Sequence, residues 1–424
     1  MVQVGNFLLP LVSCGIVNGI IRFGLDKYYK KRDVFTTGFL TILFGFIILL
    51  ILEPILVHVP YLNENTMMIY VFVLMSSMRS LCSQFVRAKG YVKLYAIDGL
   101  LSTATTIFFN VLYLVVLKWG INGYMLAMIS ADTLSTLFLF YVAGLRRYLH
   151  IRGLNLSTSQ EMLRYSIPMI PNSIFWWVNN MASRYMIAYF MGEEYNGLFA
   201  VAYKIPTIIV LMSNIFMDAW QMSAVSDSPD KRASFFTRVF LFYQSLICTA
   251  SGLILFSKVI TMILVSDSFY ESWKYIPLLL LSTIFSCMST FLGSVYMVEK
   301  KSMLNFITTG IGAVINVVLN FLFIPIFGVN GAAFATFLSY FVVFVLRVID
   351  TRRFIPMHFH PMRLTFNTLV LLAQAFIMIF EVKGWIFFEL ILTVLMVVAN
   401  MSALLATVAQ LLLKRRPHPQ HHEE

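Results

Sequence analysis

Charged residues are scarce in this chain of 424 residues: Asp, Glu, Lys and Arg make up 12% of it, and hydrophobic residues make up 59%. A soluble domain usually carries about 25% charged residues. The four cysteines all lie in apolar segments without metal-ligand spacing, so neither a disulfide scaffold nor a zinc site is expected. The chain also lacks P-loop and dinucleotide motifs, and its longest interior loop has about 19 residues. These absences argue against a soluble enzyme and against a large catalytic domain outside a membrane.

Long apolar runs fill the chain from end to end. Each is close to the length of about 20 residues that a helix needs to cross about 30 Å of hydrocarbon. The pattern predicts an all-α polytopic membrane protein. The thirteen expected spans are 3–21, 36–57, 67–86, 94–117, 124–145, 165–191, 197–222, 236–256, 274–297, 302–326, 330–349, 364–382 and 385–413.

The basic residues are distributed unevenly between the two ends of these spans. If the chain starts outside and ends inside, 24 of the 31 Lys and Arg residues fall at inner ends, four at outer ends and three within spans. Cytoplasmic ends are enriched in Lys and Arg, so this bias fixes the orientation. The net charge of +11 is therefore explained by the membrane, and nucleic acid is not expected as a partner.

One short phrase occurs twice and indicates a duplication. Gly120–Gly123, with the sequence Gly-Ile-Asn-Gly, returns 208 residues later as Gly328–Gly331, with the sequence Gly-Val-Asn-Gly. Both copies precede an apolar segment that ends in an arginine pair. We expect each phrase to form a turn at an outer helix start, where glycine permits left-handed backbone. Two such halves are typical of a transporter with two lobes.

The repeat predicts the domain organisation. We expect an N-terminal lobe at 1–152, a C-terminal lobe at 161–354, an additional helix pair at 362–413 and a cytosolic tail at 414–424. About 40 residues at the start of the second half have no counterpart in the first. The expectation is therefore two pseudo-symmetric six-helix lobes, of which the first contributes five helices here because its first helix is missing.

Several phrases, in their order and spacing, carry a resemblance to a known family. The chain resembles the polysaccharide (O-antigen and capsule repeat-unit) flippases of the multidrug/oligosaccharidyl-lipid/polysaccharide (MOP) exporter superfamily, whose fold is MATE-like. The phrases are Ile20–Asp26, Gln84–Gly90, Tyr165–Asn172 with Trp176 and Trp177, Asn196-Gly197 with Tyr203–Pro206, Asp218–Gln221 and Phe269–Pro277.

The resemblance implies a function and a location. Members of that family move undecaprenyl-pyrophosphate-linked oligosaccharides from the inner to the outer leaflet by alternating access. It therefore implies a multi-pass protein of the bacterial cytoplasmic membrane that is not an enzyme. Its partners would be lipid-linked oligosaccharide, membrane lipids and the polymerase and glycosyltransferases of the same pathway. No cofactor is expected, although H⁺ or Na⁺ coupling would fit.

Polar side chains on one face of the expected span 165–191 are the main candidates for substrate binding. Asn172, Trp176, Asn180 and Arg184 are spaced by four residues and share a helical face. A buried arginine costs roughly 2.5–3.5 kcal/mol on insertion scales, so this face is expected to line a cavity. Amides and an indole suit sugars, and a guanidinium suits phosphate. The alternative is a polar seam between helices, with Arg184 reaching toward the interface.

Other polar residues within the spans have two interpretations each. Lys204 and Asp218 fall on one face of the next expected span, either as cavity residues or as part of a packing face. Asp218 is also a candidate for ion coupling or for an ion pair with a cation on another helix. Arg79 is a second candidate cavity cation, whereas Arg22, at an inner helix end, is either a substrate contact or a topological anchor. Asp132 lies nearest mid-membrane, where a carboxylate is expected to be ion-paired, protonated or cation-binding. Asn110, Asn316 and Asn320 are expected to serve helix packing.

Three other function classes remain open from the residues alone. A multidrug exporter or a lipid II flippase of the same superfamily would share the fold, but basic residues inside the bilayer favour an anionic, lipid-linked cargo. A membrane-bound polysaccharide polymerase or glycosyltransferase usually needs a sizeable outer loop with acidic or basic residues, which this chain lacks. A partner protein that does not itself transport is the third.

The orientation predicts where a reagent added from outside can react. A cysteine placed at Asn63, in an expected outer loop, should be labelled in intact cells, and one at Ser228, in an expected inner loop, should not. Labelling in a permeabilised sample controls for reactivity. The reverse pattern would overturn the orientation.

Overall fold

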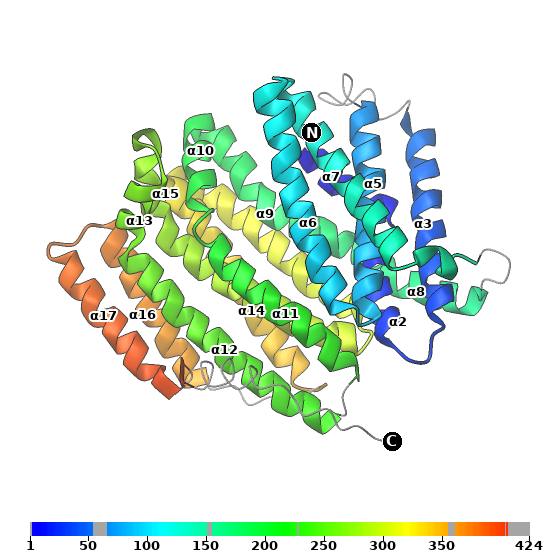
Figure 1. Cartoon of the computed structure of the whole chain (residues 1–424). Helices are drawn as coiled ribbons and strands as arrows, with labels where there is room; N and C mark the ends of the chain where they lie inside the picture. Colours follow the sequence, from blue (N-terminus) through cyan, green and yellow to red (C-terminus); the bar gives the residue numbers. More distant parts are fainter. Residues whose placement is uncertain are drawn as a thin grey trace. The chain divides into compact units, whose positions relative to one another are not determined.

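The fold is described from a computed structural model (Figure 1). It covers residues 2–53, 66–150, 155–226, 229–354, 361–402 and 404–405, without the side chains of 2–3 and 218–241. Asn63, Ser228 and the tail 414–424 lie outside these residues. The described residues form helices and no strands, as the apolar pattern predicts.

The chain divides into two compact units. Unit 1 consists of residues 1–177 and 296–307, and unit 2 consists of residues 178–295 and 308–424. The three boundaries fall inside α9, α14 and α15, so this division differs from the pseudo-symmetric halves expected at 1–152 and 161–354, which stay a prediction. The expected helix pair at 362–413 belongs to unit 2.

Unit 1 is built around one central helix. This helix, α5, packs against α1, α2, α3 and α7, and α6 packs along α7. Phe23, Phe35 and Phe85 are among the fully buried side chains of its core. The elements of unit 1 are α1 (Val2–Val12), α2 (Ile16–Leu25), α3 (Lys31–Ile51), α5 (Thr66–Ala88), α6 (Val92–Asn110), the π-helix η1 (Val111–Val116), α7 (Gly120–Val142), the 3₁₀ helix η2 (Leu145–Tyr148) and α8 (Leu156–Ser166).

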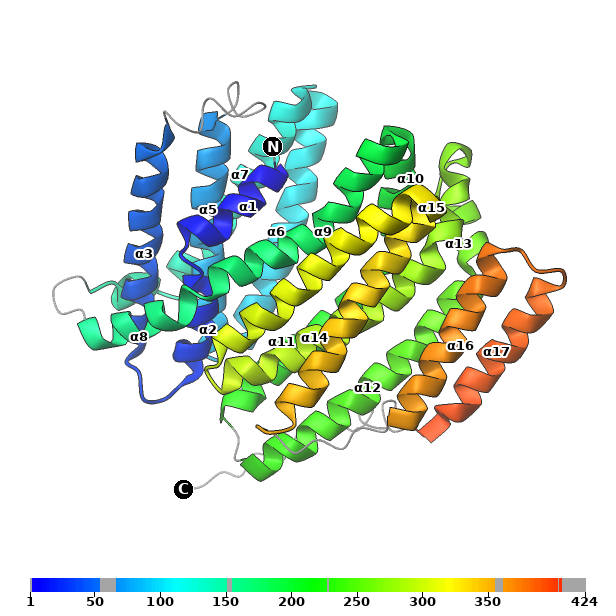
Figure 2. The ribbon, with the colours of Figure 1, turned by 180° about the vertical axis from the view of Figure 1, so that it is seen from behind.

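Unit 2 begins within α9 and contains the longest helices. Two of its helices, α16 and α17, lie side by side and pack on α12 (Figure 2). The elements are α9 (Met169–Met191), α10 (Glu193–Ala202), α11 (Thr207–Ser226), α12 (Pro229–Leu255), α13 (Ser257–Leu264), the 3₁₀ helix η3 (Asp267–Tyr275), α14 (Ile276–Val298), α15 (Ser302–Thr351), α16 (Pro361–Ile379) and α17 (Trp385–Ala399).

Seven described helices are long and apolar enough to cross a membrane, and ten are if each bent pair counts as one span. Two of the expected spans are bent in this way, and the third bent pair joins α12 to α13 at 68°, where the expected span 236–256 ends. The expected span 3–21 is two helices, α1 and α2, which meet at 52° across Cys14 and Gly15, both with left-handed backbone (φ 48° and 63°). The expected span 197–222 is α10 and α11, which meet at 48°. Pro206 lies between them and has no N–H to continue the ladder. Hydropathy alone does not distinguish these bent pairs from straight spans.

The repeated Gly-x-Asn-Gly phrase places a glycine with positive φ at the start of a helix or helix arm in both copies. The first glycine of each copy is left-handed, with φ of 57° at Gly120 and 60° at Gly328, which confirms the prediction. The second copy interrupts α15, where the chain reverses: the rings of Phe323 and Phe334 lie 5.9 Å apart. A straight helix would separate residues 11 apart by about 16 Å.

Polar contacts attach the connection between α16 and α17 to the rest of unit 2. Lys258 of α13 pairs with Glu381 in the connection between the two helices. Its ammonium also lies 4.0 Å from the centre of the Trp273 ring and 4.7 Å from that of Trp385. The hydrogen bond from Lys258, and then its charge, lower the pKa of the Glu381 carboxyl. Asn367 and Asn400 exchange two hydrogen bonds of 2.9 Å between α16 and α17.

The reversal at Gly328 depends on close backbone contact. A Cβ added to Gly331 would overlap the backbone carbonyl of Phe323. We therefore expect Gly331→Ala to lower the stability by about 1–3 kcal/mol, as overpacking does. Thermal unfolding of the purified protein in detergent measures it.

Gly252→Ala is the matched control, because nothing lies within 4 Å of a Cβ at that helical position. It should keep or raise the unfolding temperature, since alanine is favoured over glycine in a helix by about 1 kcal/mol. Equal behaviour of the two variants would contradict the tight turn.

Candidate functional site

The four candidate residues on α9 differ in their exposure. Asn172 is buried, with 4% of its surface exposed, and Trp176 is partly buried. One and two turns further on, Asn180 is exposed and Arg184 is partly exposed. The Tyr340 hydroxyl of α15 donates to the Asn180 side-chain oxygen at 3.4 Å. The accessible part of the predicted face is therefore its second half, in unit 2.

The adjacent face of α9 forms a polar seam with α15. Ser183 hydrogen-bonds Thr336 at 3.0 Å and accepts from Asn320 at 3.1 Å. One turn away, Ser339 donates to Asn179 at 3.4 Å. Asn320 also contacts Asn316, so the packing role predicted for both asparagines is confirmed. The seam uses the position next to Arg184, so it leaves the Arg184 side chain for another role.

Arg184 and Lys204 lie in the same region of unit 2. The Arg184 guanidinium lies 5.7 Å from the centre of the Tyr203 ring, and Tyr203 directly precedes the exposed Lys204 at the α10–α11 bend. No carboxylate contacts Arg184 among the described residues. Its donors are therefore available to an anion. The side chain of Asp218, the acidic candidate on α11, lies outside the described part of the chain.

Asp132 is ion-paired in unit 1. The Arg79 guanidinium donates to one carboxylate oxygen at 2.9 Å, and the Ser76 hydroxyl donates to the other. Asp98 of α6 is also buried and accepts from Ser135, which lies three residues after Asp132 on α7. Two buried carboxylates thus lie close to one guanidinium. Arg79, a predicted cavity cation, is held in this pair.

Arg22 lies near the end of α2, in unit 1. Only 8% of its surface is exposed, and it donates to Asp26 at 3.3 Å and to the Val298 carbonyl at 3.4 Å. These contacts fit the interpretation of Arg22 as a topological anchor better than its interpretation as a substrate contact. Across the described ranges, no group of three or more His, Cys, Asp or Glu side chains is placed to hold a metal ion.

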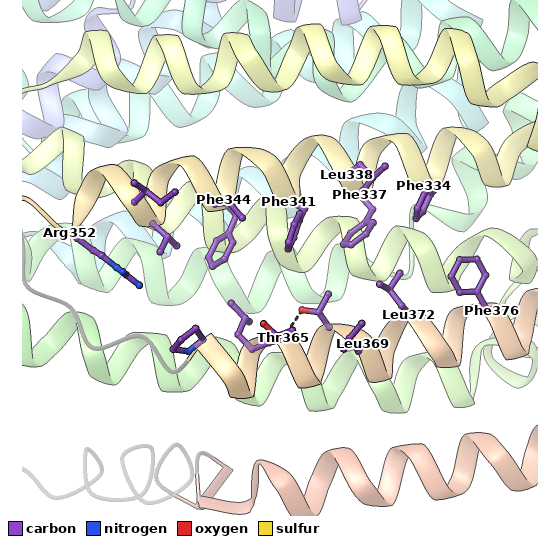
Figure 3. A pocket seen from close by; sticks show the side chains of 16 residues that line it. Phe334, Phe337, Leu338, Phe341, Phe344, Arg352, Thr365, Leu369, Leu372 and Phe376 are labelled. Atoms are coloured by element: carbon purple, nitrogen blue, oxygen red, sulfur yellow. Dashed lines mark hydrogen bonds between the residues drawn. The ribbon is translucent and has the colours of Figure 1, made fainter.

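An apolar groove of about 460 Å³ runs between the second arm of α15 and α16. Phe334, Phe337 and Phe341 project from α15 toward Leu369 and Phe376 of α16 (Figure 3). Arg352 lies at one end of the groove, where α16 begins (Figure 3). The groove is suited to a long hydrocarbon chain with an anionic group at the arginine end.

Sequence reasoning did not identify the groove, the Tyr203 contact or the role of Asp98. The phenylalanines at 334, 337, 341 and 344 follow helical spacing, which could have indicated a common face. What that face would meet, however, depends on where α16 packs. Tyr203 gave no signal, because a tyrosine at a helix end is ordinary.

Comparisons with known proteins give a family and a fold. The sequence profile of the family described as polysaccharide biosynthesis protein matches residues 1–276. No curated protein matches the chain.

Solved structures of MATE transporters share the fold. The Vibrio cholerae MATE transporter VcmN in its bent form is 14% identical, with 83% of this chain and 86% of that one covered and a TM-score of 0.62. The MATE transporter ClbM in complex with Rb⁺ is 14% identical, with 86% and 87% covered and a TM-score of 0.64. A MATE structure in the bent conformation is 12% identical, with 83% of this chain and 86% of that one covered and a TM-score of 0.66.

The Arg79–Asp132 pair makes a stability prediction. Asp132→Asn should destabilise the protein by about 3 kcal/mol, because it removes the one carboxylate that the Arg79 guanidinium contacts directly. This is the low end of the range for buried pairs, since 33% of the Arg79 side chain is exposed. Thermal unfolding in detergent measures the loss.

The double variant Arg79→Gln/Asp132→Asn should recover part of that loss, because it removes both charges together. Glu194→Gln, at the exposed start of α10, controls for loss of a carboxylate alone. Single losses that simply add in the double variant would mean that the two residues do not interact.

Proposed function

The chain belongs to the polysaccharide biosynthesis protein family, and we propose that it flips undecaprenyl-pyrophosphate-linked oligosaccharide repeat units from the inner to the outer leaflet of the bacterial cytoplasmic membrane. The family match and the fold of MATE transporters confirm the resemblance to the MOP superfamily. Alternating access of the kind found in two-lobe transporters would carry the cargo. The pathway's glycosyltransferases would supply this cargo, and its polymerase would use it.

The contacts of the Arg184 guanidinium are the observation that carries the proposal. An arginine within a membrane-spanning segment is costly unless it has a partner or a function. Arg79 has the carboxylate of Asp132, whereas Arg184 has the face of Tyr203 and no carboxylate among the described residues. A guanidinium held by a ring keeps its fork of donors for phosphate oxygens. Lys204 and the exposed amide of Asn180 would add a second charge and a contact to sugar.

The groove between α15 and α16 supports a lipid-linked cargo over a soluble one. A flexible isoprenoid chain needs an apolar path that stays continuous with the bilayer. The groove has such a lining, and Arg352 at its end would complement a phosphate. A sugar without a lipid would have no use for this lining.

We place ion coupling at the buried acids of unit 1. Asp98 and Asp132 together carry two negative charges against the single positive charge of Arg79 when both are ionised. Binding of H⁺ or Na⁺ would neutralise the excess charge in a low-dielectric region. Release of that ion would provide the energetic difference between two states of the transporter.

Two related functions rank below this one. A multidrug exporter would handle cationic drugs, for which Arg184 and Lys204 are unfavourable. A lipid II flippase would share the anionic cargo and differs in the sugar, so the cargo assay below decides. A membrane-bound polymerase or glycosyltransferase, the alternative from another class, is disfavoured by the transporter fold.

Export of surface polysaccharide tests the role of Arg184. In a strain without its own flippase, the full-length protein should restore polymer at the cell surface, and Arg184→Ala should reduce it by about 100-fold or more. That factor is what loss of a charge-assisted contact worth about 3 kcal/mol produces. Arg184→Lys should restore export only in part, because lysine lacks the planar fork.

Arg146→Ala is the matched control, since Arg146 is exposed and lies outside the spans. It should export normally. Immunoblots of the membrane fraction must show equal amounts of all variants. Normal export by Arg184→Ala at equal abundance would overturn the proposed role.

A further inference from the structure

A carboxylate lies buried in the helix pair that follows the second lobe. Glu389 is on α17, one turn after Trp385, and none of its surface is exposed. It contacts Gln374 of α16 and does not line the groove of Figure 3, which lies between α16 and α15. Nothing in the proposed transport path uses it. A buried ionisable group in a membrane helix usually has a function, because its charged form is costly there.

Three neutral side chains surround the carboxylate. The Gln374 amide donates to Glu389 Oε2 at 2.9 Å and to the Thr393 hydroxyl at 3.0 Å. Ser251 of α12 donates to the Gln374 oxygen at 2.8 Å. The network therefore ties three helices together. The other carboxylate oxygen, Glu389 Oε1, is buried and has no hydrogen-bond partner among the described residues.

No positive charge reaches this network within the described part of the chain. On α12 the titratable side chain facing α17 is Cys248, whose Sγ lies 3.7 Å from the Met396 carbonyl. At the outer end Lys258 pairs with Glu381, and on η3 Lys274 pairs with Glu271. The remaining charged groups of the pair are Lys383 in the connection and Arg363 at the inner end of α16, which donates to Ser402.

We propose that Glu389, Gln374, Ser251 and Thr393 form a proton-binding site that holds α17 against α12 and α16. The bound form is the neutral acid, since burial without a cation disfavours the charged form. A proton from water forms an O–H bond with the carboxylate, and its loss leaves an uncompensated buried charge. Rotation of the Gln374 amide by 180° lets its oxygen accept from the acid and its NH₂ group donate to Ser251.

The site bears on the groove because both use α16. Leu369, Leu372 and Phe376 line the groove, whereas Gln374 and Asn367 point to the other side, toward α12 and α17. Loss of the proton loosens α17 and leaves α16 less firmly placed beside α15. If the groove holds the lipid chain of the cargo, which rests on the proposed function, proton binding at Glu389 determines how firmly α16 is held as one side of the groove.

Cys248 is a native reporter for the site. It is 7% exposed, and its Sγ lies against α17, so a thiol reagent reaches it when α17 moves away. The full chain carrying Cys14→Ser, Cys82→Ser and Cys287→Ser retains this one thiol. Its reaction rate with N-ethylmaleimide is measured from about pH 5 to about pH 9, a range that includes the titration of buried glutamates.

The comparison is with Glu389→Gln, which has the shape of the neutral acid and cannot lose a proton. Dividing the rate of the protein that keeps Glu389 by the rate of the E389Q variant cancels the titration of the thiol itself. This ratio should be close to one at about pH 5 and rise about tenfold toward about pH 9. A ratio that does not change with pH would overturn the proposal, whatever its value.

Glu381→Gln is the matched control, because Glu381 is an exposed carboxylate in the same helix pair with a lowered pKa. It stays ionised throughout the range, so its removal should give a ratio independent of pH. A pH-dependent ratio for Glu381→Gln equal to that for E389Q would assign the effect elsewhere and refute the site. The assay contains no cargo, so its outcome is separate from that of the Arg184 export experiment.

Discussion

Hydrocarbon offers no hydrogen-bond partner, and this constraint decides where each polar group of the chain lies. A polar side chain inside a span must be satisfied by another part of the protein or must face a path that water or cargo enters. The α9–α15 seam is the first solution, and the Arg79–Asp132 pair is its charged version. Arg184 is the second solution, because its guanidinium has a ring partner and no carboxylate among the described residues. The difference between the two arginines is what separates a structural group from a candidate contact with cargo.

The sequence predicts those parts of the fold that depend on local chemistry. Apolar length identifies the helices, and the repeated glycines locate the turns at Gly120 and Gly328, because few other residues adopt that backbone. The interpretation of Asn316 and Asn320 as packing residues holds for the same reason: an amide in a span needs a partner. Each of these inferences uses the residues of one segment and does not require knowing which helix packs against it.

The sequence does not predict which of two adjacent residues on a helix faces a neighbouring helix, or which distant helix supplies a contact. Asn179 and Asn180 are adjacent, yet one joins the seam and the other is exposed. Only the packing of α15 decides between them. The bend at Cys14 and Gly15 follows Pro10 of α1, but a proline inside an apolar run does not by itself show where the helix ends. Arg79 and Arg184 look alike in the sequence, and the carboxylate that distinguishes them comes from α7, 53 residues away from Arg79.

The reversal inside α15 has a consequence for how the protein is made. The two arms of this 50-residue element are joined at Gly328 without an intervening loop. A ribosome-bound chain therefore cannot leave the first arm spanning the bilayer and present the second one later as an independent segment. The two arms are expected to enter the membrane together as a helical hairpin. The turn is also a poor place for an inserted tag or a protease site, since any added residue would have to separate backbone atoms that are already in contact.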